Sequence, residues 1–200
     1  DWSKLDVTPG KCIETYRNIH PEIAGVPTGS VYLGHIVRAG GLWKDTERAM
    51  KEAITQGKET TVGCCRWFRD GPHVYCRLPS GRHLIYRNAA TEKRVPSWGG
   101  EPRDAICFDK AGMFRESTYG GKLVENCTQS VARDLLADSL VKLAVAGLNP
   151  VLHIHDEIIC EVSDPTSIER MERIMTTGPW WAQGLPLAVE GAAMKRWGKP

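Results

Sequence analysis

The stretch Pro150-Val-Leu-His-Ile-His-Asp-Glu-Ile-Ile-Cys-Glu-Val162 decides how the rest of the chain is interpreted. Apolar, β-favouring residues run in from Val151, stop at His155-Asp156-Glu157 and resume at Ile158. The period-two spacing on both sides of this break predicts two short strands joined by a tight turn, rather than an amphipathic helix. The predicted turn carries an acidic pair at its tip.

This acidic pair has two interpretations. An ionised carboxylate set against buried strands is costly unless a positive charge meets it, and a second neighbouring acid raises the cost. A magnesium ion carrying a phosphorylated substrate would supply that charge, because Mg2+ is bound by one or two carboxylates together with phosphate oxygens. The alternative is an ordinary solvated turn, in which Asp is a common residue. The hairpin alone leaves both open.

Charge is distributed unevenly along the chain. The 200 residues are 42% hydrophobic with a net charge of +2, which fits one or two globular units and names no partner. The segment from Arg66 to Arg103 is strongly basic, whereas the segment from Pro150 to Met175 is acidic. This pairing favours a groove for a polyanion beside a metal site, and two solvated faces are the alternative.

The seven cysteines are an odd number, are scattered and form no C-x-x-C pair. The pattern predicts buried, reduced thiols in a cytosol, and neither a zinc site nor a disulfide framework. The sequence has no apolar run of about 18 residues and no signal-peptide pattern, so we expect no membrane association. The first residue is Asp1 rather than Met, which suggests a piece of a longer protein.

The pattern before residue 119 predicts helices followed by a β-meander. A helix is expected from Thr8-Pro9 toward Arg17, ending at His20-Pro21, because threonine caps helices and proline suits their first position. Turn signals such as Asp70-Gly-Pro72 separate the strands of the meander. The remaining expectations are an irregular Gly25–Gly41, a surface helix over Trp43–Gln56, a meander over Val62–Asn88, a loop over Thr91–Arg103 and short strands over Ala105–Thr118.

The longest helical pattern runs from Lys122 to Ala146, and apolar residues on two of its faces predict packing on both sides. A third stripe consists of Lys122, Asn126, Gln129 and Arg133. Its cations and amides can donate to phosphates or base edges, although an ordinary wet face would have the same pattern. Beyond the acidic hairpin, a helix is expected over Pro165–Met175 and a strand over Leu185–Glu190.

Three ordered motifs resemble the C-terminal palm region of family A DNA polymerases, the group that includes bacterial DNA polymerase I and many phage replicative enzymes. The motifs are Leu78-Pro-Ser-Gly-Arg82-x-Leu-x-Tyr86, Tyr119-Gly-Gly-Lys-Leu-x-Glu-Asn126-x-x-Gln129-x-x-Ala-Arg-Asp134 and Val151-Leu-His-x-His-Asp-Glu157. The flanking Tyr16-Arg17-x-x-His-Pro21 and the segment from Val189-Glu190 to Trp197 also fit the family. Residues 25–63 match poorly.

The resemblance implies a fold, an activity and residue roles. The fold would be α/β (α+β), with a polymerase palm-like antiparallel sheet backed by long helices. Residues 1–60 would be a helical, fingers-proximal segment and residues 61–200 the palm. Template-directed nucleotidyl transfer would use two Mg2+ ions, with Asp156 as a metal ligand, Glu157 as a supporting acid and His155 near the primer terminus. The helix stripe would line the primer–template duplex, and Arg82 would contact phosphate.

The family's first signature motif, which carries the other metal-binding aspartate, is absent, as is the helix that grips the incoming nucleotide. Asp1-Trp2-Ser3 begins like the first motif, but Lys4-Leu5-Asp6 does not continue it. The resemblance therefore implies the C-terminal part of a DNA polymerase in a bacterial cytosol or phage-infected host. Its partners would be primer–template DNA, dNTP and a second polypeptide that carries the missing motifs.

Two other hypotheses remain. The chain could be a catalytically inactive nucleic-acid-binding remnant of such a polymerase. It could also be a phosphohydrolase that uses Asp156 and Glu157 alone, although two-metal sites take carboxylates from several elements. The intact His155-Asp156-Glu157 favours the polymerase interpretation over the inactive remnant.

Overall fold

A computed structural model describes residues 8–32, 35–96, 99–110, 115–164, 166–196 and 198. The chain divides into two compact units, Asp1–Cys127 and Thr128–Pro200. The sequence features at Asp1-Trp2-Ser3, Ala111-Gly112, Pro165 and Trp197 lie outside the described residues. The expected mixed α/β class is confirmed, whereas the division into residues 1–60 and 61–200 stays a prediction. In the described residues, no helix is both long enough and apolar enough to cross a membrane.

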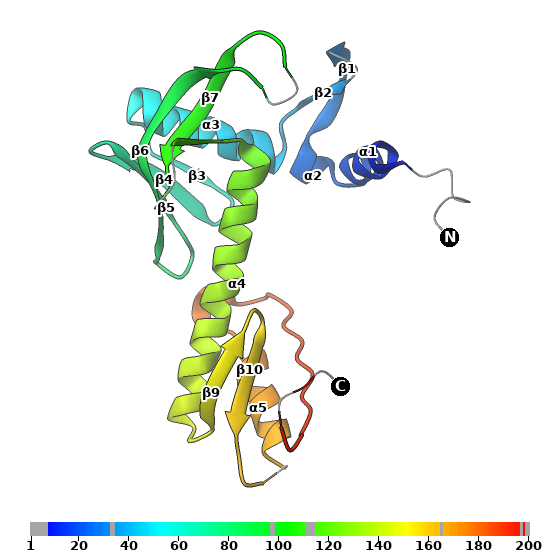
Figure 1. Cartoon of the computed structure of the whole chain (residues 1–200), viewed down its shortest axis with the longest axis vertical. Helices are drawn as coiled ribbons and strands as arrows, with labels where there is room; N and C mark the ends of the chain where they lie inside the picture. The colour runs from blue at the N-terminus through cyan, green and yellow to red at the C-terminus, as the bar shows by residue number, and fades with distance from the viewer. Residues whose placement is uncertain are drawn as a thin grey trace. The chain divides into compact units, whose positions relative to one another are not determined.

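An antiparallel sheet of six consecutive strands dominates the first unit (Figure 1). Its strands are β3 (Thr60–Val62), β4 (Cys65–Asp70), β5 (His73–Arg77), β6 (His83–Arg94), β7 (Arg103–Asp109) and β8 (Arg115–Thr118). The predicted meander and the short strands after it are confirmed. The predicted loop over Thr91–Arg103 begins too early, because β6 continues to Arg94 by pairing with β7.

A β-bulge bends the long strand β6. Its register shifts between Arg87 and Ala90, and Asn88 has a positive φ of 49°. The backbone N–H groups that the bulge frees are both satisfied, since Asn88 donates to the His73 ring at 3.0 Å and Ala89 donates to the Pro72 carbonyl at 3.1 Å. Bulges increase local twist, which explains how one strand serves both halves of a curled sheet.

The predicted surface helix is confirmed as α3 (Gly41–Gln56), which packs against strands β3 to β6. Ala49, Met50 and Ala53 are fully buried on its inner face. The sheet contributes Trp67, Val74, Cys76 and Ile106 to the same apolar interior. Small residues on the helix allow it to lie close to the sheet, so the bulky side chains come mainly from the strands.

The N-terminal part contains α1 (Pro9–Ile19), α2 (Pro21–Ala24), β1 (Val26–Tyr32) and β2 (His35–Ala39). The predicted α1 is confirmed, with the Thr8 hydroxyl accepting from the Lys11 N–H. The prediction of irregular backbone over Gly25–Gly41 is wrong, because β1 and β2 pair antiparallel. Gly29 lies where the register shifts, between Pro27 and Val31, so it occupies an irregularity within a hairpin rather than preventing one.

The helix α4 (Gly120–Val145) begins in the first unit and continues into the second. At its start Gly120 lies against α3: its N–H donates to the Glu47 carboxylate at 3.2 Å, and an added Cβ would overlap the Trp43 carbonyl. This close approach explains the Tyr119-Gly-Gly sequence. The predicted helix is confirmed. The predicted packing on two faces does not extend along its whole length, because no residue from Thr128 to Asp134 is buried.

The second unit contains most of α4, β9 (Asn149–Ile154), β10 (Glu157–Glu161), α5 (Ser167–Thr176) and a short 3-10 helix, η2 (Trp180–Ala182). Its core consists of Leu136, Leu143, Leu148 and Ile158. Gly147 ends α4 at a φ of 78°, with the Leu148 N–H bonded to the Leu143 carbonyl at 3.0 Å, a pattern typical of glycine-terminated helices.

One expectation for the second unit is confirmed and one needs correction. The predicted hairpin is confirmed, and β9 and β10 form a two-stranded sheet separate from the six-stranded one. The segment Leu185–Glu190 is not a strand and has no regular secondary structure. Its apolar residues are interrupted by Pro186, which cannot donate to a sheet ladder.

Candidate functional site

The hairpin turn places His155 and Asp156 between the paired residues Ile154 and Glu157. Asp156 therefore lies in the turn, while Glu157 begins β10, and all three side chains of His155-Asp156-Glu157 are exposed. His155 has a φ of 51°, in the left-handed region that glycine adopts most readily. A non-glycine residue in this conformation carries strain, and such strain gathers at functional turns.

The rest of the hairpin holds this turn in place. Ile158, next to Glu157, is 9% exposed and packs with Leu136 and Leu143 of α4 and with Leu148. Partly buried Cys160, Met171 and Ile174 extend this contact toward α5. The apolar residues of β10 are thus anchored on helices, while the polar tip remains accessible to a ligand.

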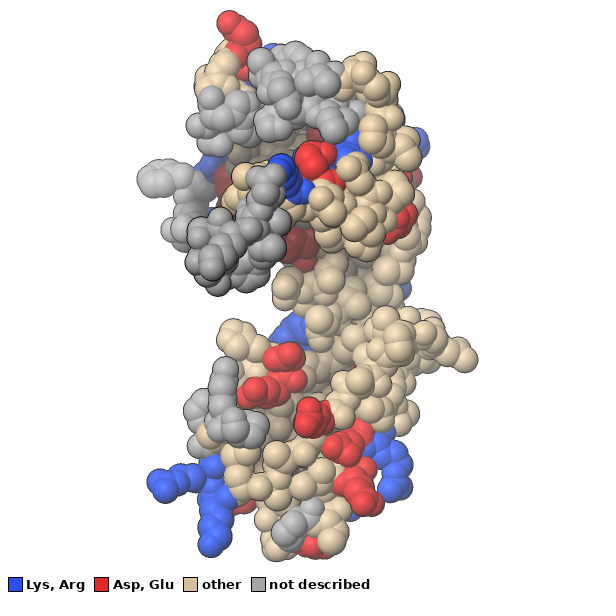
Figure 2. Space-filling view, turned by 90° about the vertical axis from the view of Figure 1, so that its right-hand side faces the viewer, with Lys and Arg blue, Asp and Glu red and all other residues tan. Residues whose placement is uncertain are grey.

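Acidic side chains gather on one face of the second unit (Figure 2). Several acids of this unit are engaged locally: Asp164 accepts from the Thr166 N–H at 2.9 Å, Glu172 accepts from the Gly191 N–H at 2.7 Å, and Asp138 pairs with Lys142 at 2.6 Å. In the described part of the chain, neither Asp156 nor Glu157 belongs to a group of three or more His, Cys, Asp or Glu side chains that could hold a metal ion. The hairpin offers two carboxylates, which suit Mg2+ in kind but supply only part of its ligands.

The predicted stripe on α4 falls into two parts. Lys122 forms an ion pair with Glu125 at 3.0 Å, and the Asn126 amide donates to the Tyr86 hydroxyl at 3.3 Å. Tyr86 is buried, and its burial raises the pKa of its phenol. Gln129 and Arg133, one and two turns further on, are exposed. The part of the stripe that is open to a ligand therefore begins at Gln129.

Arg82 follows the turn that separates β5 from β6 and is exposed. The Leu78 N–H donates to the Arg82 carbonyl at 2.8 Å, and the Gly81 N–H donates to the Leu78 carbonyl at 2.9 Å, which fixes the turn. The first of the three motifs thus forms a closed turn that presents an arginine. The structure brings Arg82 to the sheet of the first unit, whereas His155, Asp156 and Glu157 belong to the second.

Several of the eight basic residues from Arg66 to Arg103 have local partners. Lys93 pairs with Asp104 at 3.0 Å, Arg94 pairs with Glu92 at 2.9 Å, and Arg66 pairs with Glu59. Arg69 donates to the Gly71 carbonyl at 2.8 Å. Three of these basic residues are thus in ion pairs with acids, which favours the alternative of a solvated face at these positions.

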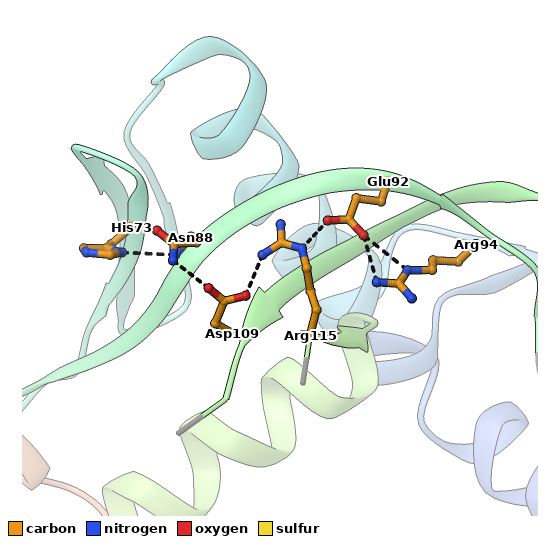
Figure 3. Close-up of polar contacts among 6 residues, drawn as sticks. All are labelled: His73, Asn88, Glu92, Arg94, Asp109 and Arg115. Carbon is orange, nitrogen blue, oxygen red and sulfur yellow. Dashed lines mark hydrogen bonds and ion pairs between the residues drawn. The ribbon is translucent and has the colours of Figure 1, made fainter. Parts of the chain in front are cut away.

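A polar chain crosses strands β5 to β8 (Figure 3). Arg115 lies between two acids, donating to Asp109 at 2.8 Å and to Glu92, which also accepts from Arg94. The Asn88 amide donates to the other Asp109 oxygen at 2.6 Å. Hydrogen bonding to Arg115 holds the pKa of Glu92 below its usual value, and bonds from Asn88 and Arg115 do the same for Asp109. These contacts tie the bulge to β7 and β8.

The hydrogen-bonded side chains of Glu92, Asp109 and Arg115 predict a pH dependence of the free energy of unfolding. Because the folded-state pKa values of Glu92 and Asp109 are lowered, their contribution is present above the unfolded values of about 4.3 and 3.9 and is lost as the pH falls through the folded ones. We expect the urea midpoint to fall as the pH is lowered below about 5. Arg115→Met should flatten this part of the profile, whereas Lys110→Met, which removes an exposed cation paired with Glu116, should not. An unchanged slope in Arg115→Met would contradict the assignment.

The prediction of buried thiols holds for Cys65, Cys76, Cys107 and Cys127 but is wrong for Cys12 and Cys64, which are exposed. Three of the buried cysteines, although far apart in the sequence, meet in the first unit. Cys65 of β4, Cys76 of β5 and Cys127 of α4 have sulfur atoms within 4.8 Å of one another, and the Cys76–Cys127 distance is 3.6 Å. Hydrogen bonding to Cys127 raises the pKa of Cys65 to about 11, and bonds from Cys65 and Cys76 lower the pKa of Cys127. Strand alternation places Cys65 and Trp67 on one face of β4, and Trp67 is the cross-strand partner of Cys76, so the sequence could have indicated that Cys65 and Cys76 are close. No spacing rule predicts that Cys127 lies beside them.

The comparisons with known proteins point to a polymerase. No family model matches the chain, and no solved structure matches it. A curated protein that does match is the DNA polymerase of Bacillus phage SP02, which is 34% identical over 158 residues. The match covers 74% of this chain and 23% of the phage protein, so the chain spans about a quarter of the length of the relative it matches. The chain is therefore related to a phage DNA polymerase.

Proposed function

We propose that this chain is the C-terminal palm part of a family A DNA polymerase and contributes one catalytic carboxylate, Asp156, to template-directed nucleotidyl transfer. The observation that carries the proposal is the exposed His155-Asp156-Glu157 turn, strained at His155 and anchored on α4 and α5. The relation to a phage DNA polymerase supports it. A solvated turn without a function has no need of a strained histidine where glycine would fit.

Asp156 and Glu157 would hold Mg2+, with Asp156 in the turn as the direct ligand and Glu157 on β10 as the supporting acid. When bound, the ions lower the pKa of the primer 3′-hydroxyl and neutralise charge on the triphosphate. The chain's own contribution is position: burial of Ile158 fixes where β10 begins and therefore where the two carboxylates project. His155, next to them, would face the primer terminus.

The remaining metal ligands would come from residues outside these 200, in the same or a second polypeptide. Two observations support this. Asp156 and Glu157 have no third ligand among the described residues. The two-stranded sheet also leaves apolar side chains uncovered, since Val151 and Leu152 of β9 are 52% and 48% exposed. A further strand that paired with this hairpin would cover them and satisfy its open edge.

The exposed end of the stripe would contact the primer–template duplex. Gln129 and Arg133 project from α4 into solvent, and a glutamine amide and a guanidinium suit base edges and phosphates respectively. Lys122 and Asn126 would extend the track after giving up their contacts with Glu125 and Tyr86. Arg82 would bind a backbone phosphate.

The direct test is a chimeric polymerase in which this chain replaces the matching segment of the phage SP02 enzyme. Extension of a labelled primer in the presence of Mg2+ and dNTP is expected. A chimera that folds and binds primer–template DNA but adds no nucleotide would overturn the catalytic proposal and favour the alternative of an inactive DNA-binding remnant.

Gln129→Ala should weaken DNA binding more than chemistry. Loss of one hydrogen bond to the duplex costs about 0.5–1.5 kcal/mol, which corresponds to a roughly 2- to 10-fold rise in the Kd of the chimera for primer–template DNA. Fluorescence anisotropy measures the Kd, and single-turnover extension at saturating DNA measures the chemical step. Gln183→Ala is the matched control, because Gln183 is also exposed but lies after η2. Equal Kd values for the two variants would remove Gln129 from the interface.

A further inference from the structure

The cysteine cluster of Cys65, Cys76 and Cys127 has no part in the proposed polymerase chemistry. The three residues are 7%, 0% and 9% exposed, in that order, and they come from two neighbouring strands and the first part of α4. Single buried cysteines act as small apolar residues and need no further explanation. Three sulfur atoms gathered within 4.8 Å of one another are a different arrangement, because they converge on one point in the interior.

The spacing of the sulfur atoms suits a tetrahedral metal ion. A zinc–sulfur bond of about 2.3 Å places two thiolates of a tetrahedral site about 3.8 Å apart. The Cys76 and Cys127 sulfurs are 3.6 Å apart, and the other distances within the cluster do not exceed 4.8 Å. Small side-chain rotations would bring all three to ligand distance. The three donors are soft, which selects zinc over magnesium or calcium.

Cys64 is the next cysteine to the cluster. It lies in the turn between β3 and β4, is exposed and hydrogen-bonds with Cys65, and its sulfur is not among the three that lie within 4.8 Å of one another. Because it occupies a turn rather than a paired strand position, its side chain does not have to alternate to the face opposite Cys65. A closed set of four cysteines is the usual composition of a structural zinc site.

We propose that Cys65, Cys76 and Cys127 bind one zinc ion, with Cys64 as the fourth ligand. The ion is structural. It joins the start of α4, which carries Lys122 and Asn126, to strands β4 and β5 of the sheet. Its ligands are thiolates, whereas the proposed magnesium ligands of the hairpin are carboxylates. Loss of zinc and loss of the proposed polymerase activity are therefore separate outcomes.

The test is metal binding by the 200-residue chain in the presence of a phosphine reductant. One equivalent of Co2+ should bind with a thiolate charge-transfer band and the intense visible bands of a tetrahedral site, and Zn2+ should displace it. X-ray absorption of the zinc form should show a first shell of sulfur at about 2.3 Å. A shell of oxygen and nitrogen, or no binding at all, would overturn the proposal without the need for any variant.

Variants locate the site. Cys76→Ser should weaken zinc binding by at least about 100-fold, because a thiolate ligand is lost from a site whose binding energy is shared among few donors. Cys107→Ser is the matched control: Cys107 is equally buried in the same sheet but lies outside the cluster, and its variant should bind zinc like the parent. Cys64→Ser should retain one zinc with three sulfur ligands. Equal zinc affinity of the Cys76 and Cys107 variants would refute the site.

Discussion

Asp156→Asn in the chimeric polymerase is expected to lower the rate of nucleotide incorporation by roughly 100-fold to several-thousand-fold. The substitution keeps the shape of the side chain and removes the charge that would hold a catalytic metal ion. Loss of such a contact in the transition state costs about 3–5 kcal/mol. The Kd for primer–template DNA should change little, because Asp156 is exposed in a turn and the proposed duplex contacts come from α4 and Arg82. Single-turnover extension and anisotropy measure the two quantities separately.

Glu161→Gln is the control for this substitution. Glu161 is another exposed acid of the same hairpin, but it ends β10 and pairs with Asn149, far from the turn. It should therefore leave incorporation near the parent rate. Near-normal incorporation by the Asp156 variant would end the catalytic assignment, and an equal loss in both variants would mean that net acidity of the surface matters rather than a metal ligand.

The second large effect is an absence of activity: the purified 200-residue chain alone should extend no primer. A pair of magnesium ions and a triphosphate require more ligands than Asp156 and Glu157 provide. In the described part of the chain, no further metal-ligating side chain joins these two. The assay combines the chain with primer–template DNA, Mg2+ and dNTP, and the chimera serves as the positive control.

A trace of host polymerase would mimic activity, so the same preparation of the Asp156→Asn chain must be assayed beside the parent. Extension that persists in both is contamination. Extension by the parent chain that disappears in the variant would show that the 200 residues are a complete catalyst, and the proposal of an incomplete site would be wrong.

The sequence predicted the elements whose signals are local. Asp70-Gly-Pro72 marked a turn of the meander, Thr8-Pro9 marked the start of α1, and Gly147 marked the end of α4, because each residue type meets a specific backbone requirement. The hairpin of β9 and β10 was also predictable, since its apolar alternation breaks only at the polar turn. In these cases the neighbouring residues alone determine the conformation.

Features that depend on distant partners were missed. The β1–β2 hairpin was interpreted as irregular because its glycines are turn signals, although Arg38 holds it by donating to Glu14 and Asn18 of α1. The strands β9 and β10 form a sheet separate from the six-stranded one. The cysteine cluster joins residues 51 positions apart. No local pattern reports any of these contacts.

The central claim is that the turn at His155-Asp156-Glu157 lies at the primer terminus of a DNA polymerase. The most direct measurement is photo-cross-linking of the chimera to a primer whose 3′-terminal nucleotide carries a photoreactive base, followed by mass spectrometry of the adduct peptide. The account predicts an adduct within residues 153–158, dependent on a paired template. An adduct confined to peptides outside the hairpin, from a complex that still extends the primer, would contradict it.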